Sequence, residues 1–474
     1  MRHDHLSQMH DVVVVGGGNA ALIAAIAARR AGADDVLLLE RAPTWIRGGN
    51  SRHTRNTRCA HDHDGAGQAF MSGAYPEEEL LEDLVQVGGG PSANPDFTRK
   101  AVRESTSVIP WMTGLGVRWQ RPLAGTLHLT RTNAFFLGGG KALVNTYYHA
   151  AAAMGIKVQY EAAVCELLID GDRIDGVVIE DETTHQRRIV RARSVIVACG
   201  GFEANLAWLK EYWGDAAENY VVRGTPYNDG RVLRALLDAG AVPISDPRGF
   251  HAVAVDARAP RFDGGIATRL DSVPFGIVVN IRGCRFADEG ANLWPKRYAS
   301  WGTLIALQED QIAYSIFDAR MLGRFITSLY HPFQAATIGE LGTQLGLDPA
   351  AVIQTVECFN RSIPPGGTFN PEVLDDCATV GLDPPKSHWA VPIAEPPFYG
   401  YAMRPGITFT YRGVAVDECT RVQLASGPMR NLYAAGEIMA GNILQQGYLA
   451  GFGLTIGTVS GRIAGSQAAT HARC

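Results

Sequence analysis

The sequence lacks several features that would place it in well-known protein classes. No two of its eight cysteines form a C-x-x-C pair, which argues against a zinc ribbon or an iron–sulfur cluster held by this chain. No apolar run reaches the roughly 18–20 residues that a membrane-spanning helix needs. The 43 basic and 48 acidic side chains leave a net charge of −5, so no strong positive field favours nucleic acid. We therefore expect no metal site and no nucleic-acid partner.

The amino terminus also lacks the pattern of a secretory signal. Its first ten residues, MRHDHLSQMH, are polar, and we expect them to form a loose leader. Scattered cysteines without a signal peptide do not predict a disulfide framework. The cytoplasm is therefore the expected location.

Glycine, by contrast, is abundant. It accounts for 53 of the 474 residues, about 11% against a usual value of about 7%. This excess predicts many tight turns, or a backbone that lies close to a ligand. A length of 474 residues predicts two to four domains at about 150 residues each.

The first informative segment is a strand–turn–helix–strand unit. The β-branched run Val12–Val15 predicts a buried parallel strand, and it leads into the sequence GGGNAA, which starts at Gly16. The following LIAAIAARRAG predicts a helix that ends at Gly32, and Val36–Leu39 predicts a second strand. These elements, followed by the acidic Glu40, are typical of a dinucleotide-binding βαβ unit. Glu40 is placed to bind a ribose with a free 2′-hydroxyl, which favours NAD or FAD over NADP.

Further strand–glycine turns separate FAD from NAD. They are Val195–Ala198 with Cys199-Gly200-Gly201, Leu432–Ala435 with Gly436-Glu437, and the glycine-punctuated Gly447–Gly465, which feeds a helix. An NAD domain needs one glycine loop, whereas the longer FAD needs backbone donors far from the first one. A last helix with its N-terminus toward the flavin would stabilise the reduced flavin anion. The sequence therefore predicts FAD.

At these residues the chain resembles the fumarate reductase/succinate dehydrogenase flavoprotein superfamily. The resemblance runs from the opening fingerprint through GGNS, ACGGF, the Asp229-Gly230 pair, RFADE and LYAAGE to the closing GRIAG. Within it, GGNSRHTRNTR, WPKRYASWG and AGEIMAGNILQQGYLAGFGLTIGT are similar to the FAD-dependent tricarballylate dehydrogenases. The implied fold is α/β: a discontinuous, Rossmann-like FAD-binding domain with an inserted α+β capping domain.

The resemblance implies domain boundaries and a cofactor site. Residues 1–247 and 397–474 would form the two parts of the FAD-binding domain, and 248–396, rich in proline and aromatic residues, would form the capping domain. Covalent flavin attachment through His53 is not expected, because the attachment position of the respiratory members aligns nearer Ser51. The expected cofactor-binding residues are Gly16, Gly18, Asn19, Ala20, Glu40, Arg41, Gly49, Asn50, Ser51, Val164, Ala198, Gly200, Gly201, Asp229, Gly436, Glu437, Gly453, Leu454 and Thr455.

The resemblance also implies a proton-transferring arginine shortly after an R-F-x-x-E motif. Here RFADE begins at Arg285 and is followed by the WPKRY segment, so Arg297 is the first candidate, with Lys296 and Tyr298 as alternatives. An arginine of ordinary pKa is a poor base, and Arg297 could instead hold a carboxylate as a bidentate fork. Both roles remain open.

Two departures from the fumarate reductase pattern argue against fumarate or succinate as the substrate. Where those enzymes carry a histidine in P-G-V-H-H-T, this chain has PGITFT from Pro405. Where they carry an arginine in A-N-R-L-G-G, it has QGYLAG from Gln446. Both anchors of a four-carbon dicarboxylate are therefore absent from the sequence.

An arginine-rich set replaces these anchors, and planar guanidinium groups match carboxylates well. The expected substrate-binding residues are Arg52, His251, Tyr411, Arg412 and Tyr448. His251 could equally be a hydrogen-bonded structural histidine. Three further arginines of this set could equally be solvated loop charges, namely Arg55, Arg58 and Arg131.

The sequence thus predicts an FAD-dependent dehydrogenase that oxidises a CH–CH bond next to carboxylates. The resemblance implies oxidation of tricarballylate to cis-aconitate, with electrons passing to a membrane-associated iron–sulfur protein linked to quinone. The chain would then lie in the cytoplasm, peripheral to the inner membrane through that partner. The alternative substrates are a corrinoid precursor of precorrin synthesis and a ketosteroid desaturated at Δ1. In a different class of function, the chain would be an FAD-binding electron-transfer subunit without its own substrate.

Overall fold

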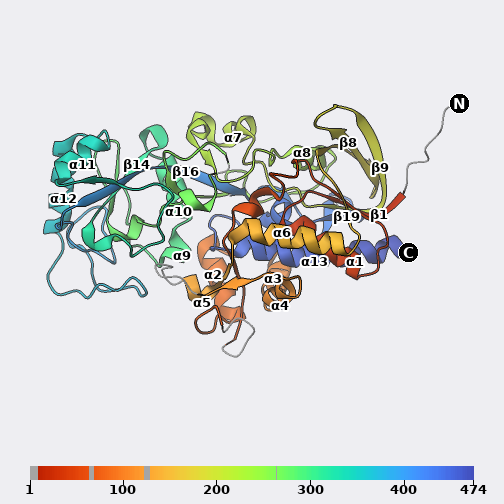
Figure 1. Cartoon of the computed structure of the whole chain (residues 1–474), viewed down its shortest axis with the longest axis horizontal. Helices are drawn as coiled ribbons and strands as arrows, with labels where there is room; N and C mark the ends of the chain where they lie inside the picture. The colour runs from red at the N-terminus through yellow and green to blue at the C-terminus, as the bar shows by residue number, and fades with distance from the viewer. Residues whose placement is uncertain (1–8, 63–68, 122–128, 263) are drawn as a thin grey trace.

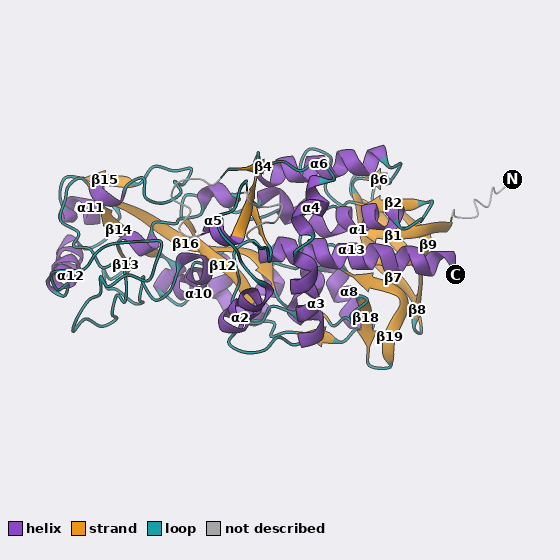
Figure 2. Cartoon of the chain, turned by 90° about the horizontal axis from the view of Figure 1, so that it is seen from below, coloured by secondary structure: helices purple, strands orange, loops and turns teal. Residues whose placement is uncertain are grey.

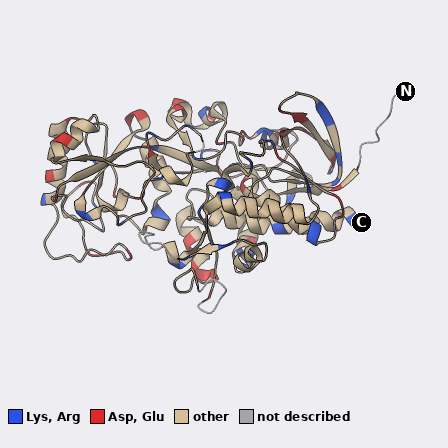
Figure 3. Ribbon diagram, in the orientation of Figure 1, with Lys and Arg blue, Asp and Glu red and all other residues tan. Residues whose placement is uncertain are grey.

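The computed structural model describes residues 9–62, 69–121, 129–262 and 264–474. Within these residues the molecule is elongated, with one large β-sheet in each half and two smaller sheets of two and three strands (Figure 1). The mixed α/β fold confirms the predicted fold class. None of the helices in the described part of the chain combines the length and the apolar character needed to cross a membrane. Acidic and basic residues are interspersed over both halves in the view of Figure 3.

The first sheet has eight strands and a mainly parallel centre. The order β18-β19-β9-β1-β2-β6 is parallel from β19 to β6, while β7, β8 and β9 form an antiparallel meander. Its strands are β1 (Met9–Val15), β2 (Val36–Leu39), β6 (Lys157–Gln159), β7 (Ala162–Asp170), β8 (Arg173–Asp181), β9 (Arg187–Val197), β18 (Arg421–Leu424) and β19 (Gly427–Ala434). The run Val12–Val15 is buried, as expected for a parallel strand covered on both faces.

Two helices from opposite ends of the sequence pack together against this sheet. They are α1 (Asn19–Arg30) and α13 (Phe452–Arg473), which lie side by side in Figures 1 and 2. A Cβ at Gly461 would lie 2.6 Å from the carbonyl oxygen of Ala20, and one at Gly465 would lie 2.2 Å from that of Ala24. Glycine at these positions therefore allows the two helices to approach closely.

The second sheet has six strands and is organised around one long strand, β16 (Phe398–Thr410). This strand pairs with β10, β12, β14 and β15, and it runs from the far end of the molecule to its middle (Figure 2). The other strands are β10 (Val221–Val222), β12 (Phe250–Asp256), β13 (Ile277–Asn280), β14 (Ala313–Asp318) and β15 (Phe333–Ala335). Two of the six strands, β10 and β16, lie outside residues 248–396, and the domain division stays a prediction.

The remaining elements surround the two sheets. The helices are α2 (Glu77–Gly88), α3 (Pro95–Ser105), α4 (Val108–Thr113), α5 (Leu129–Thr132), α6 (Gly139–Ala153), α7 (Leu206–Trp213), α8 (Arg231–Asp238), α9 (Trp294–Arg297), α10 (Ser300–Ala306), α11 (Ile338–Gln344) and α12 (Pro349–Arg361). The short strands are β3 (Asn56–Arg58), β4 (Trp119–Gln120), β5 (Asn133–Phe136), β11 (Pro243–Ile244) and β17 (Gly413–Val414). Two short 3₁₀ segments, η1 (Gly49–His53) and η7 (Gly436–Asn442), also contribute to the site described below.

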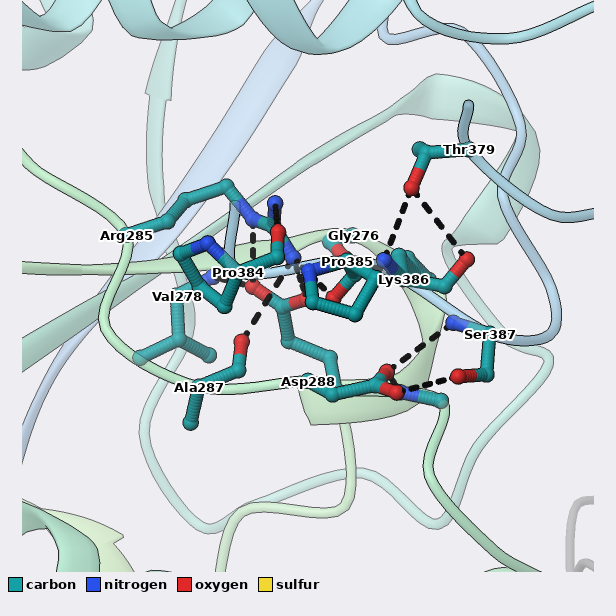
Figure 4. Close-up of polar contacts among 12 residues, drawn as sticks. Gly276, Val278, Arg285, Ala287, Asp288, Thr379, Pro384, Pro385, Lys386 and Ser387 are labelled. Carbon is teal, nitrogen blue, oxygen red and sulfur yellow. Dashed lines mark hydrogen bonds and ion pairs between the residues drawn. The ribbon is translucent and has the colours of Figure 1, made fainter. Parts of the chain in front are cut away.

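The RFADE motif forms a buried ion pair in the second half of the molecule (Figure 4). Arg285 donates from Nε and Nη2 to the two carboxylate oxygens of Glu289, at 3.0 and 2.5 Å. Glu289 has no exposed surface, and it also accepts the backbone N–H of Val278 at 2.8 Å. The motif therefore anchors strand β13 within the second half of the molecule.

A buried lysine completes this anchor. Lys386 Nζ donates to the carbonyl oxygens of Pro274 and Gly276 at 2.8 and 2.5 Å (Figure 4). Burial lowers the pKa of Lys386 to about 8. Next to it, Ser387 donates its backbone N–H to Asp288 at 3.0 Å. Residues 384–387 are thereby tied to the start of β13 and to the RFADE segment.

Candidate cofactor cleft and substrate cavity

A large cavity lies at the carboxyl ends of the parallel strands, where ligands bind in open α/β sheets. The space between its walls, including open solvent at its mouth, amounts to about 1570 Å³. One end is lined by the ends of β1, β2 and β9, by η1 and η7, and by the start of α13. The other end is lined by residues next to β10, in β12 and β16, and next to α9. The cavity therefore joins a dinucleotide-binding edge to the second sheet.

The first end fits the phosphates of a dinucleotide. Gly16 has φ +117°, and a Cβ there would lie 2.4 Å from the carbonyl oxygen of Ala198. The N-cap of α1 is Gly18, which offers no side-chain acceptor to the first turn of the helix. A Cβ at Gly18 would meet no atom closer than Ser51 Oγ at 3.4 Å, so this side faces open space. The N–H of Asn19 donates to Ser51 Oγ at 3.0 Å, while the following N–H groups of the first turn and the positive end of α1 suit a pyrophosphate.

Most of the predicted cofactor-binding residues line this cavity. They are Gly16, Gly18, Asn19, Ala20, Glu40, Arg41, Gly49, Asn50, Ser51, Val164, Ala198, Gly200, Asp229, Gly436, Glu437, Gly453 and Leu454. Gly201 and Thr455 are not part of the lining. Thr455 is fully buried and shares a hydrogen bond of 2.9 Å with Thr57 Oγ1. A Cβ at Gly201 would lie 2.1 Å from Thr410 Oγ1, so the absence of a side chain there leaves space for the polar groups of Thr410, Glu437 and Glu203.

Glu40 and Arg41 are held in place at the end of β2. Glu40 is buried and accepts the backbone N–H of Ala42 at 2.8 Å, while burial raises the pKa of its carboxyl group. Arg41 donates to Asp229 at 2.6 Å and to Glu182 at 2.7 Å. A carboxyl group at this position is suited to a ribose hydroxyl.

Two buried carboxyl groups, Glu203 and Glu437, share a hydrogen bond behind Gly201. Glu203 also accepts the side-chain amides of Asn50 and of Asn228, the latter at 2.7 Å. Adjacent buried carboxylates do not both ionise. Burial and the charge of Glu203 raise the pKa of Glu437 well above its usual value. Because two amides stabilise the ionised form of Glu203, we assign the shared proton to Glu437, which lines the cavity.

This assignment predicts how stability depends on pH. Above the unfolded-chain carboxyl pKa of about 4.3, the folded protein keeps a proton on Glu437 that the unfolded chain has released, until the pH rises through the raised pKa of the folded state. The contribution of this group to the free energy of unfolding is therefore greatest at low pH and falls as pH rises. Glu437→Gln should remove this decline, because an amide donates to Glu203 without titrating. Urea unfolding at several pH values would measure it, with the exposed Glu309→Gln as control. Parallel pH profiles for Glu437→Gln and the unmodified protein would contradict the assignment.

Three arginines line the far end of the cavity: Arg223 and Arg269, which are buried, and Arg55, whose side chain is 14% exposed. Arg223 Nη1 donates to Thr408 Oγ1 at 2.9 Å, whereas Nε and Nη2 of Arg55 and Nε of Arg269 have no hydrogen-bond partner among the described residues. Burial, followed by repulsion from Arg269, lowers the pKa of Arg55 to about 9 and that of Arg223 to about 10. Donors with unused capacity that repel one another are suited to an anionic ligand.

A histidine and two tyrosines lie beside these arginines. His251 Nε2 and the Tyr298 hydroxyl are 3.0 Å apart, and the rings of His251 and Tyr448 lie 3.9 Å apart between centroids. Burial, together with Arg223 and Arg269, lowers the pKa of His251 well below its usual value. The imidazole is therefore neutral at pH 7. With its proton on Nδ1, Nε2 accepts the hydrogen bond that Tyr298 donates.

The structure brings only part of the predicted catalytic and substrate-binding set to the cavity. Tyr298, His251 and Tyr448 line it, whereas Lys296 and Arg297 do not. Successive residues of a helix point about 100° apart, so the turn that directs Tyr298 inward directs its two predecessors elsewhere. Lys296 instead forms an ion pair with Asp83. The pKa of Arg297 is lowered by partial burial.

The other predicted substrate-binding residues also lie outside the cavity lining. Tyr411 is fully buried and donates to the carbonyl oxygen of Gly447 at 2.9 Å. Arg412 donates to the carbonyl oxygen of Ser245 at 3.3 Å, and Arg52 in η1 is not part of the lining. Two of the arginines whose role the sequence leaves open, Arg58 and Arg131, are also not part of the lining. Arg58 Nη1 donates to the Tyr75 hydroxyl at 2.9 Å, and Arg131 Nη1 donates to Glu79 Oε2 at 3.1 Å.

Two of the three cavity arginines are not predicted from the sequence. Arg223 follows the two-residue strand β10, and Arg269 follows the 3₁₀ turn 266–268, so neither belongs to a recognisable motif. Arg55 belongs to the predicted arginine-rich set with its role left open, and it lies directly before β3, four residues after Ser51 in the predicted cofactor loop. Only the pairing of β10 and β12 with β16 brings these segments to one cavity.

Comparisons with known proteins agree with this geometry. The model of the FAD binding domain family matches residues 11–454. NADH:fumarate oxidoreductase of Klebsiella pneumoniae (strain 342) is 28% identical over 458 residues, which cover 92% of this chain and 45% of the relative. The 4-oxocyclohexanecarboxylate 2-dehydrogenase of Sinomonas cyclohexanicum is 27% identical over 378 residues, covering 72% of this chain and 63% of that protein. The chain thus spans less than two thirds of the length of either relative.

A solved structure agrees at the level of the fold. The open conformation of a flavocytochrome c3 fumarate reductase superposes with a TM-score of 0.74 and 23% sequence identity, covering 98% of this chain and 79% of that one. FAD is therefore the cofactor of the cleft described above, which confirms the predicted cofactor, while its noncovalent attachment stays a prediction. The chain belongs to the FAD binding domain family, within the fumarate reductase/succinate dehydrogenase flavoprotein superfamily of FAD-dependent oxidoreductases.

Proposed function

We propose that this protein oxidises a CH–CH bond in a small polycarboxylate, with tricarballylate as the substrate and cis-aconitate as the product. The observation that carries the proposal is the convergence of Arg55, Arg223 and Arg269 at the end of the cavity away from the fingerprint. Guanidinium forks bind carboxylates in a fixed orientation, and buried forks do so more strongly than exposed ones. An apolar substrate would leave these buried charges without partners.

The chain's own residues account for binding and proton transfer. The cofactor cleft would hold FAD, which would supply the hydride acceptor for one substrate carbon. Arginine contacts to a carboxylate increase the acidity of the C–H bond on the adjacent carbon. In our proposal the Tyr298 oxygen takes that proton while its own hydroxyl proton passes to the neutral His251, 3.0 Å away. The ring of Tyr298 lies 4.8 Å from the Arg269 guanidinium, which favours negative charge on the phenol oxygen during this transfer.

We also propose the route by which the electrons leave. The similarity of WPKRYASWG and AGEIMAGNILQQGYLAGFGLTIGT to tricarballylate dehydrogenases supports a membrane-associated iron–sulfur protein as the acceptor. The chain would meet this partner at the cytoplasmic side of the inner membrane.

A second candidate substrate is an oxo acid that carries both a ketone and a carboxylate. Two tyrosines, Tyr298 and Tyr448, line the same cavity, and tyrosine hydroxyls can polarise a ketone. The Sinomonas relative is named for such a substrate, 4-oxocyclohexanecarboxylate. The arginines would then bind its carboxylate.

An anaerobic titration of the purified flavoprotein separates these candidates. Tricarballylate should bleach the flavin absorption near ~450 nm, because the substrate reduces the bound cofactor. The same titration with 4-oxocyclohexanecarboxylate, a 3-oxosteroid and a corrinoid precursor tests the alternatives. If one of these compounds bleaches the flavin and tricarballylate does not, the tricarballylate assignment is wrong. If none of them does, the electron-transfer subunit becomes the better description.

A further inference from the structure

A single carboxylate, Asp271, lies among the three cavity arginines. It has 2% of its surface exposed and does not itself line the cavity. One of its oxygens accepts Arg269 Nη2 at 2.6 Å, and the other accepts the indole N–H of Trp294 at 2.7 Å. Arg55 Nη2 lies 3.6 Å from Asp271 Oδ2. Among the described residues, no other carboxylate lies within ion-pair distance of any of these arginines.

Asp271 therefore fixes the charge of the substrate end of the cavity as well as its geometry. Three guanidinium groups with one carboxylate carry a formal charge of +2. The arginines hold the pKa of Asp271 below its usual range, so this carboxylate is ionised at pH 7. Because the cluster is buried, solvent screens the difference between a dianionic and a trianionic ligand only weakly.

We propose that Asp271 is a specificity-determining residue that sets how strongly the cavity distinguishes a tricarboxylate from a dicarboxylate. The inference rests on the proposed function, because it takes a polycarboxylate as the ligand. Asp271 lowers the positive charge that a ligand meets, and this limits the advantage of each additional negative charge on that ligand. Its contact with Trp294 also explains what the WPKRY segment contributes to the site.

Asp271→Asn separates charge from structure. The variant keeps the size of the side chain and one oxygen acceptor but removes the negative charge. Trp294→Phe is the complementary change, because it removes the indole donor to Asp271 and leaves the charge in place. Asp256→Asn is the matched control, since Asp256 is equally buried in β12 but pairs with Arg258 rather than with a cavity arginine.

The ligands for the test are tricarballylate and glutarate, which share one carbon chain and differ by the central carboxylate. Calorimetry on the anaerobically reduced holoenzyme gives both dissociation constants without turnover. In Asp271→Asn, the preference for tricarballylate over glutarate should rise by about tenfold, because the extra positive charge acts on three carboxylates rather than two. Trp294→Phe and Asp256→Asn should keep the ratio of the unmodified protein.

The binding measurements distinguish a failure of the charge role of Asp271 from a failure of the proposed function. A ratio in folded Asp271→Asn that stays within about twofold of the unmodified value, or an equal shift in Trp294→Phe, would overturn the charge role. If the unmodified protein binds neither acid, the proposed function fails and this inference fails with it. If Asp271→Asn does not yield folded flavoprotein, Asp271→Ser makes the same change of charge and is judged by the same ratio.

Discussion

Replacing Tyr298 with phenylalanine should slow the reduction of the flavin by tricarballylate by about 10²–10⁴-fold, the usual contribution of a positioned general acid or base. The variant removes the hydroxyl group that lies 3.0 Å from His251 and leaves the three cavity arginines unchanged. Binding should therefore change little, while the chemical step becomes slow. Stopped-flow absorbance under anaerobic conditions measures the rate, and calorimetry on the reduced enzyme measures the binding.

Tyr401→Phe is the matched control for this experiment. Tyr401 is also buried, but it lies in β16 and does not line the cavity. Its loss should leave the rate of flavin reduction near that of the unmodified protein. Reduction of Tyr298→Phe at the unmodified rate would rule out Tyr298 as the proton acceptor. Arg55 would then be the next candidate, because burial and Arg269 lower its pKa to about 9.

Glu289→Ala should destabilise the protein by about 3–5 kcal/mol, because it leaves a buried arginine without its counterion. Glu289 has no exposed surface, accepts two N–H groups of Arg285, and accepts the N–H of Val278 (Figure 4). The substitution removes all three of these hydrogen bonds at once. Urea unfolding of the holoenzyme, followed by circular dichroism, would measure the change in the free energy of unfolding.

An exposed ion pair of the same type provides the control. Glu309 accepts Arg282 Nη2 at 2.8 Å, and both side chains are more than half exposed. Solvent screens such pairs, so Glu309→Ala should cost less than about 1 kcal/mol. Equal losses in the two variants would mean that burial does not determine the strength of the RFADE ion pair.

The cofactor half of the fold could be predicted because its signals are local. In the opening fingerprint, strand, turn, helix and second strand occur within about thirty residues, and the backbone of each follows from its own sequence. Val36–Leu39 forms β2 over the predicted residues, and the helix predicted to end at Gly32 is α1, Asn19–Arg30. The glycine turns that follow β9 and β19 likewise lie at the cavity.

The substrate end could be predicted only in part, because its residues come together through non-local strand pairing. Arg223 and Arg269 are 46 positions apart and reach one cavity through the sheet built on β16. Spacing from RFADE located the α9 segment but could not indicate which of its side chains faces inward. The direction of each side chain depends on how α9 packs against the rest of the protein, and a five-residue sequence pattern does not indicate that packing. Tyr298 faces the cavity, and Arg297 does not.

The packing of α13 on α1 has a consequence for the order of events during synthesis. The helix that covers the opening fingerprint is made of residues 452–473, more than 400 residues after the strand and turn that it completes. The cavity wall likewise needs η7 and the start of α13. A ribosome-bound chain therefore holds an unfinished cofactor cleft, with the apolar face of α1 uncovered, until these residues have emerged. Acquisition of the flavin must therefore wait until α13 has emerged from the ribosome.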